Sequence, residues 1–162
     1  MATTLVSSAL LADRLGDPLW RVFDCRHLLN DPAVGRAAYA RSHLPGAFFL
    51  HLDEDLSAPT NGRNGRHPLP DPQFLAAKLG AAGVSAETRV VAYDDSGGMF
   101  AARLWWLLRW LGHTRVAVLD TSGRPLKGKA VRVVGRLETT ISHRKRLVGG
   151  FYAYENQHQS KD

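Results

Sequence analysis

Cysteine is scarce in this sequence, and long apolar runs are missing from it. The 162 residues include one cysteine, Cys25, so no disulfide can form within the chain. The most apolar stretch, from Met99 to Leu111, is interrupted by Arg103 and Arg109. It falls short of the roughly 18–20 apolar residues that span a bilayer. These absences exclude a disulfide-stapled fold and predict a chain that has no membrane partner.

A secretory signal and a metal-ligand motif are also missing. Residues 1–11 contain no basic residue, and Asp13 and Arg14 interrupt the apolar run too early for a signal peptide, so we expect a cytoplasmic location. The seven histidines show neither HxxxH nor HxH spacing, and a single cysteine cannot supply a thiolate set. We therefore expect no metal and no cofactor.

Charge is divided unevenly along the chain. Residues 1–123 hold 12 Lys and Arg against 12 Asp and Glu, whereas residues 124–162 hold 9 against 3, which accounts for the net charge of +6. No aromatic platform or recognition motif accompanies the basic run Arg144-Lys145-Arg146. We therefore do not expect nucleic acid as a partner, because specific recognition needs more than a solvated basic run.

Helical and extended segments alternate before this basic tail. Amphipathic runs that follow Ser7 and Asp71 are typical of capped helices, and short β-branched or aromatic runs are typical of buried strands. Residues 51–70 are rich in Gly, Pro and Asn and predict a long surface excursion. The predicted helices span 8–15, 33–42, 71–83 and 99–111, and the predicted strands span 20–23, 47–50, 89–93 and 116–119.

This alternation predicts an α/β fold, a doubly wound and mostly parallel sheet with helices on both faces. In such sheets the reactive position is normally the loop that leaves the carboxyl end of a central strand. Here that loop follows the strand 89–93 and precedes the long helix, and its residues are Asp94, Asp95, Ser96, Gly97, Gly98 and Met99.

The loop is a candidate anion cradle, since backbone amides near a helix start attract negative charge. Asp94 is able to accept hydrogen bonds from these amides and so to fill the cradle itself. The adjacent pair Asp94-Asp95 leaves two alternatives open: helix capping and loop shaping, which we favour, and cation binding or acid–base catalysis. The glycines Gly97 and Gly98 belong to no GxGxxG or GxxxxGK motif, so nucleotide binding has little support.

A family resemblance follows from five segments. The stretch from Tyr39 to Leu50, YARSHLPGAFFL, fits an aromatic-xxx-His-aliphatic-Pro-Gly-Ala pattern and resembles the rhodanese superfamily. The supporting segments are 22–26, 65–70, 90–94 and 101–106. Over roughly residues 3–120, the sequence is similar to the first, non-catalytic repeat of tandem-domain thiosulfate and 3-mercaptopyruvate sulfurtransferases, which implies a rhodanese-like fold.

The resemblance implies a sulfurtransferase domain without its nucleophile. The family transfers sulfane sulfur through a cysteine persulfide on the second repeat, and Asp94 occupies the corresponding position here. We therefore expect the chain to be inactive alone and to have a catalytic rhodanese repeat or another subunit as partner. The alternative is a non-enzymatic binding or regulatory module that recruits a partner domain. Cys25 is only a weak candidate thiol, because it lies outside the loop.

Two other features have structural interpretations. His43 lies in a turn, where fixing that turn by hydrogen bonding is favoured over acting as a base. Trp106 and Trp110 are four residues apart and share one face of the long helix, whereas Trp105 projects elsewhere. One of these faces is a candidate for contact with a second repeat.

The domain boundary is expected at residue 122. Residues 1–122 form the rhodanese-like domain, and residues 123–162 form a divergent basic tail, with disorder as one alternative and short strands at Val131–Val134 and Leu147–Tyr154 as another. The resemblance stops after Asp120, and a shifted reading frame or a recombined gene end is the leading hypothesis for this break.

Overall fold

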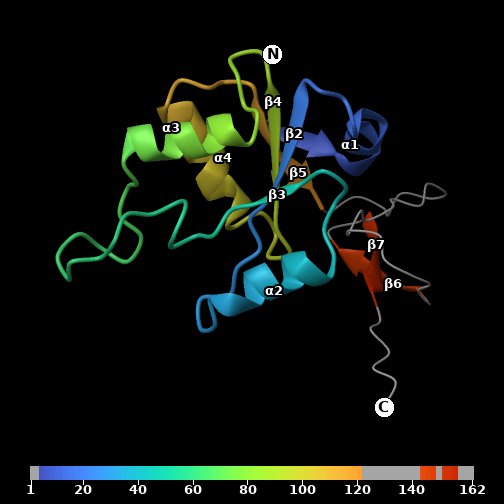
Figure 1. Cartoon of the computed structure of the whole chain (residues 1–162), viewed down its shortest axis with the longest axis horizontal. Coiled ribbons are helices and arrows are strands. Elements are labelled where there is room, and N and C mark those ends of the chain that lie inside the picture. Colours follow the sequence, from blue (N-terminus) through green and yellow to red (C-terminus); the bar gives the residue numbers. More distant parts are fainter. Residues whose placement is uncertain (1–3, 122–142, 149–150, 157–162) are drawn as a thin grey trace.

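A five-stranded parallel sheet forms the centre of the protein (Figure 1). The computed structural model describes residues 4–121, 143–148 and 151–156. In space the strands follow the order β1-β5-β4-β2-β3. Their bounds are β1 Leu5–Ser7, β2 Trp20–Asp24, β3 Phe48–Phe49, β4 Arg89–Tyr93 and β5 Val116–Asp120. The predicted α/β class with a mostly parallel sheet is confirmed.

Strand β4 is central because its side chains are apolar on both faces. Val90, Val91 and Ala92 are all fully buried, as expected for a strand covered by helices on either side. It pairs with β2 and with β5. The carboxyl ends of β2 and β4 therefore lie next to each other, with Asp24 opposite Tyr93.

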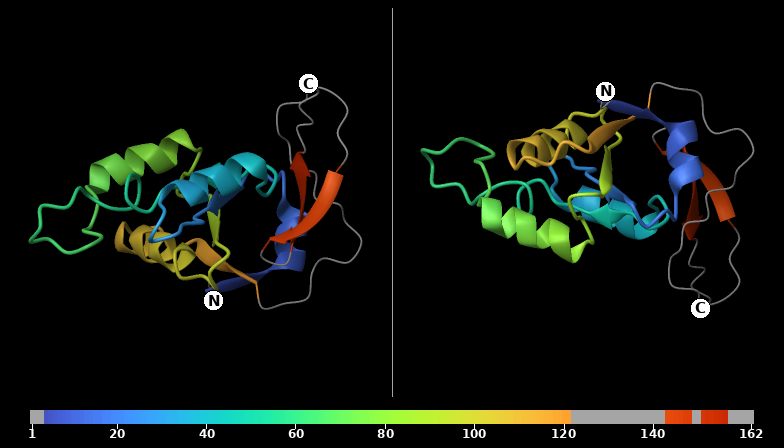
Figure 2. Two further views of the ribbon diagram at one scale, coloured as in Figure 1. Left: turned by 90° about the horizontal axis from the view of Figure 1, so that it is seen from below. Right: turned by 90° about the horizontal axis from the view of Figure 1, so that it is seen from above.

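Helices cover both faces of the sheet (Figure 2). One face packs against α3, Pro72–Ala81, and α4, Ala101–Trp110. The other face packs against α1, Ser8–Arg14. The remaining helix, α2, spans Ala33–Arg41 and precedes β3. Alternate residues of β4 belong to the two separate apolar clusters, which is the period-two arrangement of a strand between two layers.

Two predicted helix starts are confirmed by their capping bonds. Ser7 Oγ accepts the amide of Leu10 at 3.3 Å, and Asp71 Oδ1 accepts the amide of Phe74 at 2.8 Å, with Pro72 in the first turn. These bonds satisfy amides that have no partner within the helix.

Two predictions within the domain need correction, and one strand was missed. Strand β1 was not predicted, because three residues are too few to show a periodicity. The prediction that residues 51–70 form a surface excursion is wrong for their first part, since Leu52 and Leu56 are buried in the core. The long helix begins at Ala101 rather than Met99. Gly97 and Gly98, with φ of 69° and 89°, keep the preceding residues out of the helix, and the Asp94 carboxylate caps the amides of residues 100 and 101.

The tail contains two described strands. The structure has β6, His143–Val148, paired antiparallel with β7, Phe151–Asn156, where a single strand Leu147–Tyr154 was predicted. That prediction was wrong because the described residues form two strands that pair with each other, and not one continuous strand. The strand predicted at Val131–Val134 lies outside the described residues. Within the described ranges, every helix is too short or too polar to span a bilayer.

Candidate functional site

The loop after β4 is wrapped around the side chain of Asp94. Its carboxylate is buried, with 1% of the residue exposed. Oδ1 accepts the amides of Ser96 and Gly98, each at 2.8 Å. Oδ2 accepts the amides of Phe100 and Ala101, each also at 2.8 Å. The hydrogen bonding predicted for Asp94 is therefore present, and both oxygens are fully engaged.

Two glycines let the loop point its amides inward. Gly97 has φ of 69° and Gly98 has φ of 89°, both in the left-handed region that glycine adopts without steric cost. Asp95 and Met99 are more exposed than Asp94, and Met99 is 58% exposed. The cradle is thus filled by the chain's own carboxylate, and a role for the loop toward an external anion stays a prediction.

A buried ion pair lies at the carboxyl ends of β2 and β4, next to the start of the loop. Arg26 Nη2 donates to Asp24 Oδ2 at 2.6 Å and to the carbonyl of Ser42 at 2.6 Å. The Tyr93 hydroxyl donates to the same Asp24 oxygen at 2.6 Å. Burial, reinforced by the Asp24 charge, raises the pKa of Tyr93 well above its usual value, so the hydroxyl stays a donor. This network fixes the ends of β2 and β4 relative to each other.

Cys25 lies in this interior and not in the loop. It is 2% exposed, and burial, followed by the charges of Asp24, Asp94 and Asp55, raises the pKa of its thiol well above the usual value. Because the thiolate is the reactive form, a thiol in this setting is a poor nucleophile.

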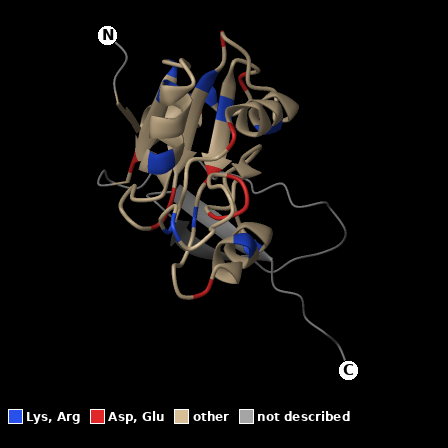
Figure 3. Ribbon diagram, turned by 90° about the vertical axis from the view of Figure 1, so that its left-hand side faces the viewer, with Lys and Arg blue, Asp and Glu red and all other residues tan. Residues whose placement is uncertain are grey.

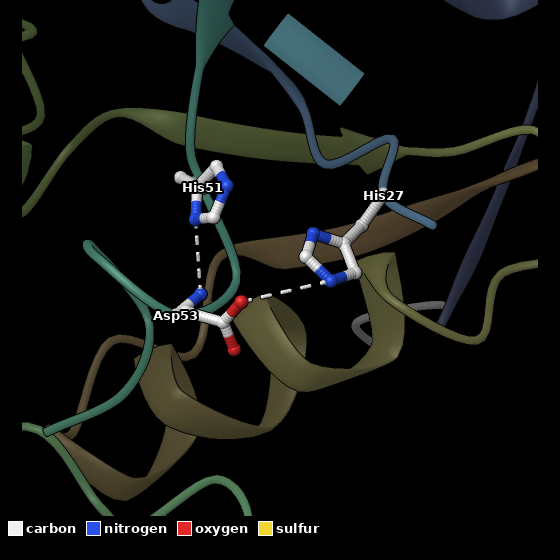
Figure 4. A group of neighbouring side chains, drawn as sticks. All are labelled: His27, His51 and Asp53. Carbon is white, nitrogen blue, oxygen red and sulfur yellow. Dashed lines mark hydrogen bonds and ion pairs between the residues drawn. The ribbon is translucent and has the colours of Figure 1, made fainter. Parts of the chain in front are cut away.

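A second polar cluster lies near the same edge of the sheet and was missed by sequence reasoning. Asp53 Oδ2 lies 3.8 Å from His27 Nε2, and Asp53 Oδ1 lies 3.1 Å from His67 Nδ1. Figure 4 shows His27 pointing toward the Asp53 carboxylate. Burial lowers the pKa of His27, against the opposing effect of Asp53. These three residues, named here the His–Asp–His cluster, come from three separate segments, so no short motif announces them.

His51 adjoins the cluster and orients it. Its Nδ1 accepts the amides of Asp53 at 3.2 Å and Glu54 at 3.3 Å. Its Nε2 lies 3.1 Å from the carbonyl of Pro32 and donates to it, because a carbonyl can only accept. Nδ1 therefore holds the turn that carries Asp53 (Figure 4), whereas Nε2 bonds to Pro32 before helix α2, so both ring nitrogens are occupied.

Helix α4 connects the cluster with the Asp94 loop. Arg103 Nε donates to the carbonyl of Leu56 at 2.9 Å, and its Nη2 donates to the carbonyls of His67 and Pro68, each at 3.0 Å. Burial lowers the pKa of Arg103. Figure 3 shows Asp and Glu in the loops at the centre of the view and also at its top and bottom, so acidic residues are not confined to this region. The helix that begins at the cradle thus also anchors the segment bearing His67.

A cavity of about 450 Å³ lies elsewhere. Its lining includes Arg14, Trp20, Arg21 and Phe48 and contains no residue of the Asp94 loop or of the His–Asp–His cluster.

His43 has the predicted structural contact, because its Nδ1 lies 2.8 Å from the carbonyl of Tyr39.

The fold and the site together indicate the class of protein. It is a parallel α/β domain in which a loop at the carboxyl end of the central strand encloses an anionic group. The family model described as "Rhodanese-like domain" matches residues 7–123. The chain belongs to this rhodanese-like family, as the resemblance implied.

Several proteins of this family are similar to the chain. The "Probable 3-mercaptopyruvate sulfurtransferase" of Pseudomonas aeruginosa is 53% identical over 109 residues, which are 67% of this chain and 38% of that protein. The 3-mercaptopyruvate sulfurtransferase of Homo sapiens is 38% identical over 122 residues, which are 71% of this chain and 38% of that protein. The chain thus spans about two fifths of the length of these relatives.

Solved structures agree with this assignment. The 3-mercaptopyruvate sulfurtransferase of Leishmania major matches with a TM-score of 0.67 and 32% identity, covering 74% of this chain and 32% of that one. SseA of Escherichia coli matches with a TM-score of 0.62 and 31% identity, covering 74% of this chain and 46% of that one. The match lies in the first part of such proteins, so the resemblance to a first repeat is confirmed.

Proposed function

We propose that this chain is the non-catalytic first repeat of a thiosulfate or 3-mercaptopyruvate sulfurtransferase and transfers no sulfur by itself. The observation that carries the proposal is the carboxylate of Asp94 in the loop after β4, with both oxygens bonded to backbone amides. A second repeat, on this protein or another, would supply the cysteine. The chain's coverage of about two fifths of its relatives supports this division.

The chemistry explains why a carboxylate cannot replace the thiol. In sulfur transfer from thiosulfate, a thiolate attacks the outer sulfur, a new S–S bond forms, and sulfite leaves with the electrons of the broken bond. The protein then holds a persulfide until an acceptor takes the sulfur. Asp94 can form no such bond, and Cys25 is buried with a raised thiol pKa.

A persulfide assay tests the proposal directly. The purified chain is incubated separately with thiosulfate and with 3-mercaptopyruvate, and protein-bound sulfane sulfur and thiocyanate release to cyanide are measured. We expect neither, whereas a cysteine-bearing rhodanese protein run in parallel gives both. Turnover that persists in Cys25→Ser would overturn the proposal, because it would place the transferable sulfur on a group other than the only thiol.

A binding or regulatory role is the second candidate, and the exposed tryptophans favour it. Trp106 and Trp110 are 46% and 41% exposed, and their rings stack with centroids 6.1 Å apart. Such a pair suits contact with a partner domain. We expect Trp106→Ala to weaken co-purification with a separately produced cysteine-bearing repeat, while Leu19→Ala, at an exposed site elsewhere, leaves it unchanged. Equal recovery with both variants would reject this role.

The proposal also covers the boundary of the rhodanese-like domain and the location of the protein in the cell. The domain ends near residue 122, and the family match, which stops at 123, supports this boundary. We propose a cytoplasmic protein whose basic tail arose from a shifted reading frame or a recombined gene end. Sequencing the encoding DNA tests this origin, since a continuous downstream repeat in the same frame would contradict it.

A further inference from the structure

The loop formed by residues 59–66 contains the same tripeptide twice. Its sequence includes Asn61-Gly62-Arg63-Asn64-Gly65-Arg66, and all of these residues are exposed. The loop projects from the sheet and the helices (Figure 1), and a bond of 3.2 Å from the amide of Ala58 to the carbonyl of Pro68 closes its base. Both asparagines are followed by glycine and then arginine, so the loop compares two chemically matched sites that differ in conformation.

An asparagine that precedes glycine can lose its side-chain amide without an enzyme. The backbone amide of the glycine gives its proton to solvent base, and its nitrogen attacks the side-chain carbon Cγ of the asparagine. A bond between this nitrogen and Cγ forms, the bond from Cγ to Nδ2 breaks, and ammonia leaves with a proton taken from water. Water then opens the succinimide ring at either carbonyl and gives aspartate or isoaspartate. Glycine favours the attack because no side chain hinders its nitrogen and its backbone bends freely.

The attacking amides of the two sites are alike. Among the described residues, neither the amide of Gly62 nor that of Gly65 donates a hydrogen bond. Both glycines have positive φ, 78° at Gly62 and 86° at Gly65. The difference between the sites therefore lies in the side chains of the asparagines.

The side chain of Asn61 points toward the residues that follow it. Its Oδ1 accepts the amides of Arg63 at 2.9 Å and Asn64 at 3.0 Å. These bonds bend the side chain over the peptide that contains the Gly62 amide, which brings Cγ toward the attacking nitrogen. The same two donors stabilise the negative charge that develops on Oδ1 when the nitrogen adds to Cγ. The leaving atom, Nδ2, has no hydrogen-bond partner in the described part of the chain.

The side chain of Asn64 is held in the opposite direction. Its Oδ1 accepts the amide of Asn61 at 2.9 Å, and its Nδ2 donates to the carbonyl of Pro59 at 3.0 Å. Both bonds direct the side chain toward residues that precede it and away from the Gly65 amide. The bond to Pro59 also restrains the nitrogen that would leave. This asparagine is therefore protected, although its sequence context is the same.

We propose that Asn61 is a site of spontaneous deamidation and that the hydrogen bonds of the loop protect Asn64 from the same reaction. The conversion replaces a neutral amide by a carboxylate, so it lowers the net charge of +6 by one. Where isoaspartate forms, the main chain also gains the side-chain methylene at this position. The modification site goes beyond the proposed function and is independent of it.

Peptide mapping of the full chain tests this proposal, because cleavage after Arg63 and Arg66 places the two asparagines on separate peptides. The chain is kept at mildly alkaline pH without denaturant, and samples are digested with trypsin at intervals. Mass spectrometry then gives the deamidated fraction at each asparagine, relative to a sample taken at the start. We expect Asn61 to convert about tenfold faster than Asn64, which corresponds to about 1.4 kcal/mol in activation free energy.

The same chain in urea is the matched control. Once the loop bonds are lost, the two asparagines should convert at similar rates, because their following residues are identical. Two variants assign the rapid conversion. Asn61→Gln should abolish it, since the longer side chain closes the ring far more slowly. Asn64→Asp keeps an oxygen acceptor for the Asn61 amide and should leave it unchanged.

Three results would overturn the proposal. The first is equal conversion of the two asparagines without denaturant, or faster conversion of Asn64. The second is the lack of conversion at both positions. The third is a rate ratio that persists in urea, because its cause would then lie in the sequence and not in the fold of the loop.

Discussion

Helix α4 links the Asp94 loop to the His–Asp–His cluster. The two regions differ in how far the hydrogen-bonding groups of their side chains are matched by partners. In the loop, both oxygens of one carboxylate are matched by backbone amides from a single short segment. In the cluster, a carboxylate and two imidazoles from distant segments are close together with nitrogens unmatched among the described residues. The difference teaches that the polar atoms of the loop are matched by hydrogen bonds within one short segment, whereas the contacts of the cluster depend on packing between distant segments.

Removing the Asp94 carboxylate should have the largest effect on folding. Asp94→Ala leaves four amides without their acceptor, two of them buried and two part-buried, and each buried donor costs about 1–3 kcal/mol, the part-buried ones less because water can reach them. We expect the free energy of unfolding to fall by about 3–5 kcal/mol, measured by urea denaturation. Asp95→Ala, at an exposed neighbour, should change it by less than about 0.5 kcal/mol. Equal effects of the two substitutions would show that the cradle is not held by its carboxylate.

Breaking the link between the two regions should have an intermediate effect. Arg103→Met removes the bonds to the carbonyls of Leu56, His67 and Pro68 while keeping much of the apolar stem. We expect a loss of about 2 kcal/mol in unfolding free energy, because bonds from a charged donor contribute about 1.5–3 kcal/mol. Lys78→Met, which removes an ion pair with Asp55 from a half-exposed lysine, is the comparison and should cost less. An Arg103→Met protein as stable as the parent would contradict the anchoring role.

Two histidines of similar burial should respond differently to removal. His51→Leu deletes an acceptor for two amides and a donor to Pro32, and we expect it to cost about 2 kcal/mol. His27→Leu deletes a ring whose Nδ1 has no partner among residues 4–121, and we expect a change within about 1 kcal/mol. Thermal unfolding of the two variants and the parent chain compares them. If His27→Leu were the more damaging, the unmatched nitrogen would have to be bonded in solution.

The ionisation of the Cys25 thiol should have the smallest effect on stability and the clearest dependence on pH. Burial raises its thiol pKa, so the unfolded chain loses this proton first as the pH rises above about 8.5, and stability decreases there. At pH near 8 we expect the folded thiol to react with a disulfide reagent more than ~10-fold slower than in urea, since each unit of pKa lowers the thiolate fraction tenfold. Rapid reaction without denaturant would place Cys25 at the surface.

Much of the fold followed from local chemistry. The caps at Ser7 and Asp71, the apolar strand Arg89–Tyr93 and the glycine-bearing loop after it are each encoded within a few residues. Strand β1 and the buried part of residues 51–70 did not follow, because their placement depends on contacts with distant segments. Leu5 pairs with Val118, and Leu56 packs in the core although its neighbours in sequence are polar.

The sequence by itself determined that Asp94, and not a cysteine, follows the central strand, because the residue type at each position is read directly from the sequence. Only the tertiary structure decided that His27, Asp53 and His67 meet. Parallel strands bring their carboxyl ends to one edge of a sheet, and α4 pins the segment carrying His67 there through Arg103. The spacing of the three residues along the chain could not predict that they are close together, because tertiary packing places them there and no helical or strand periodicity does.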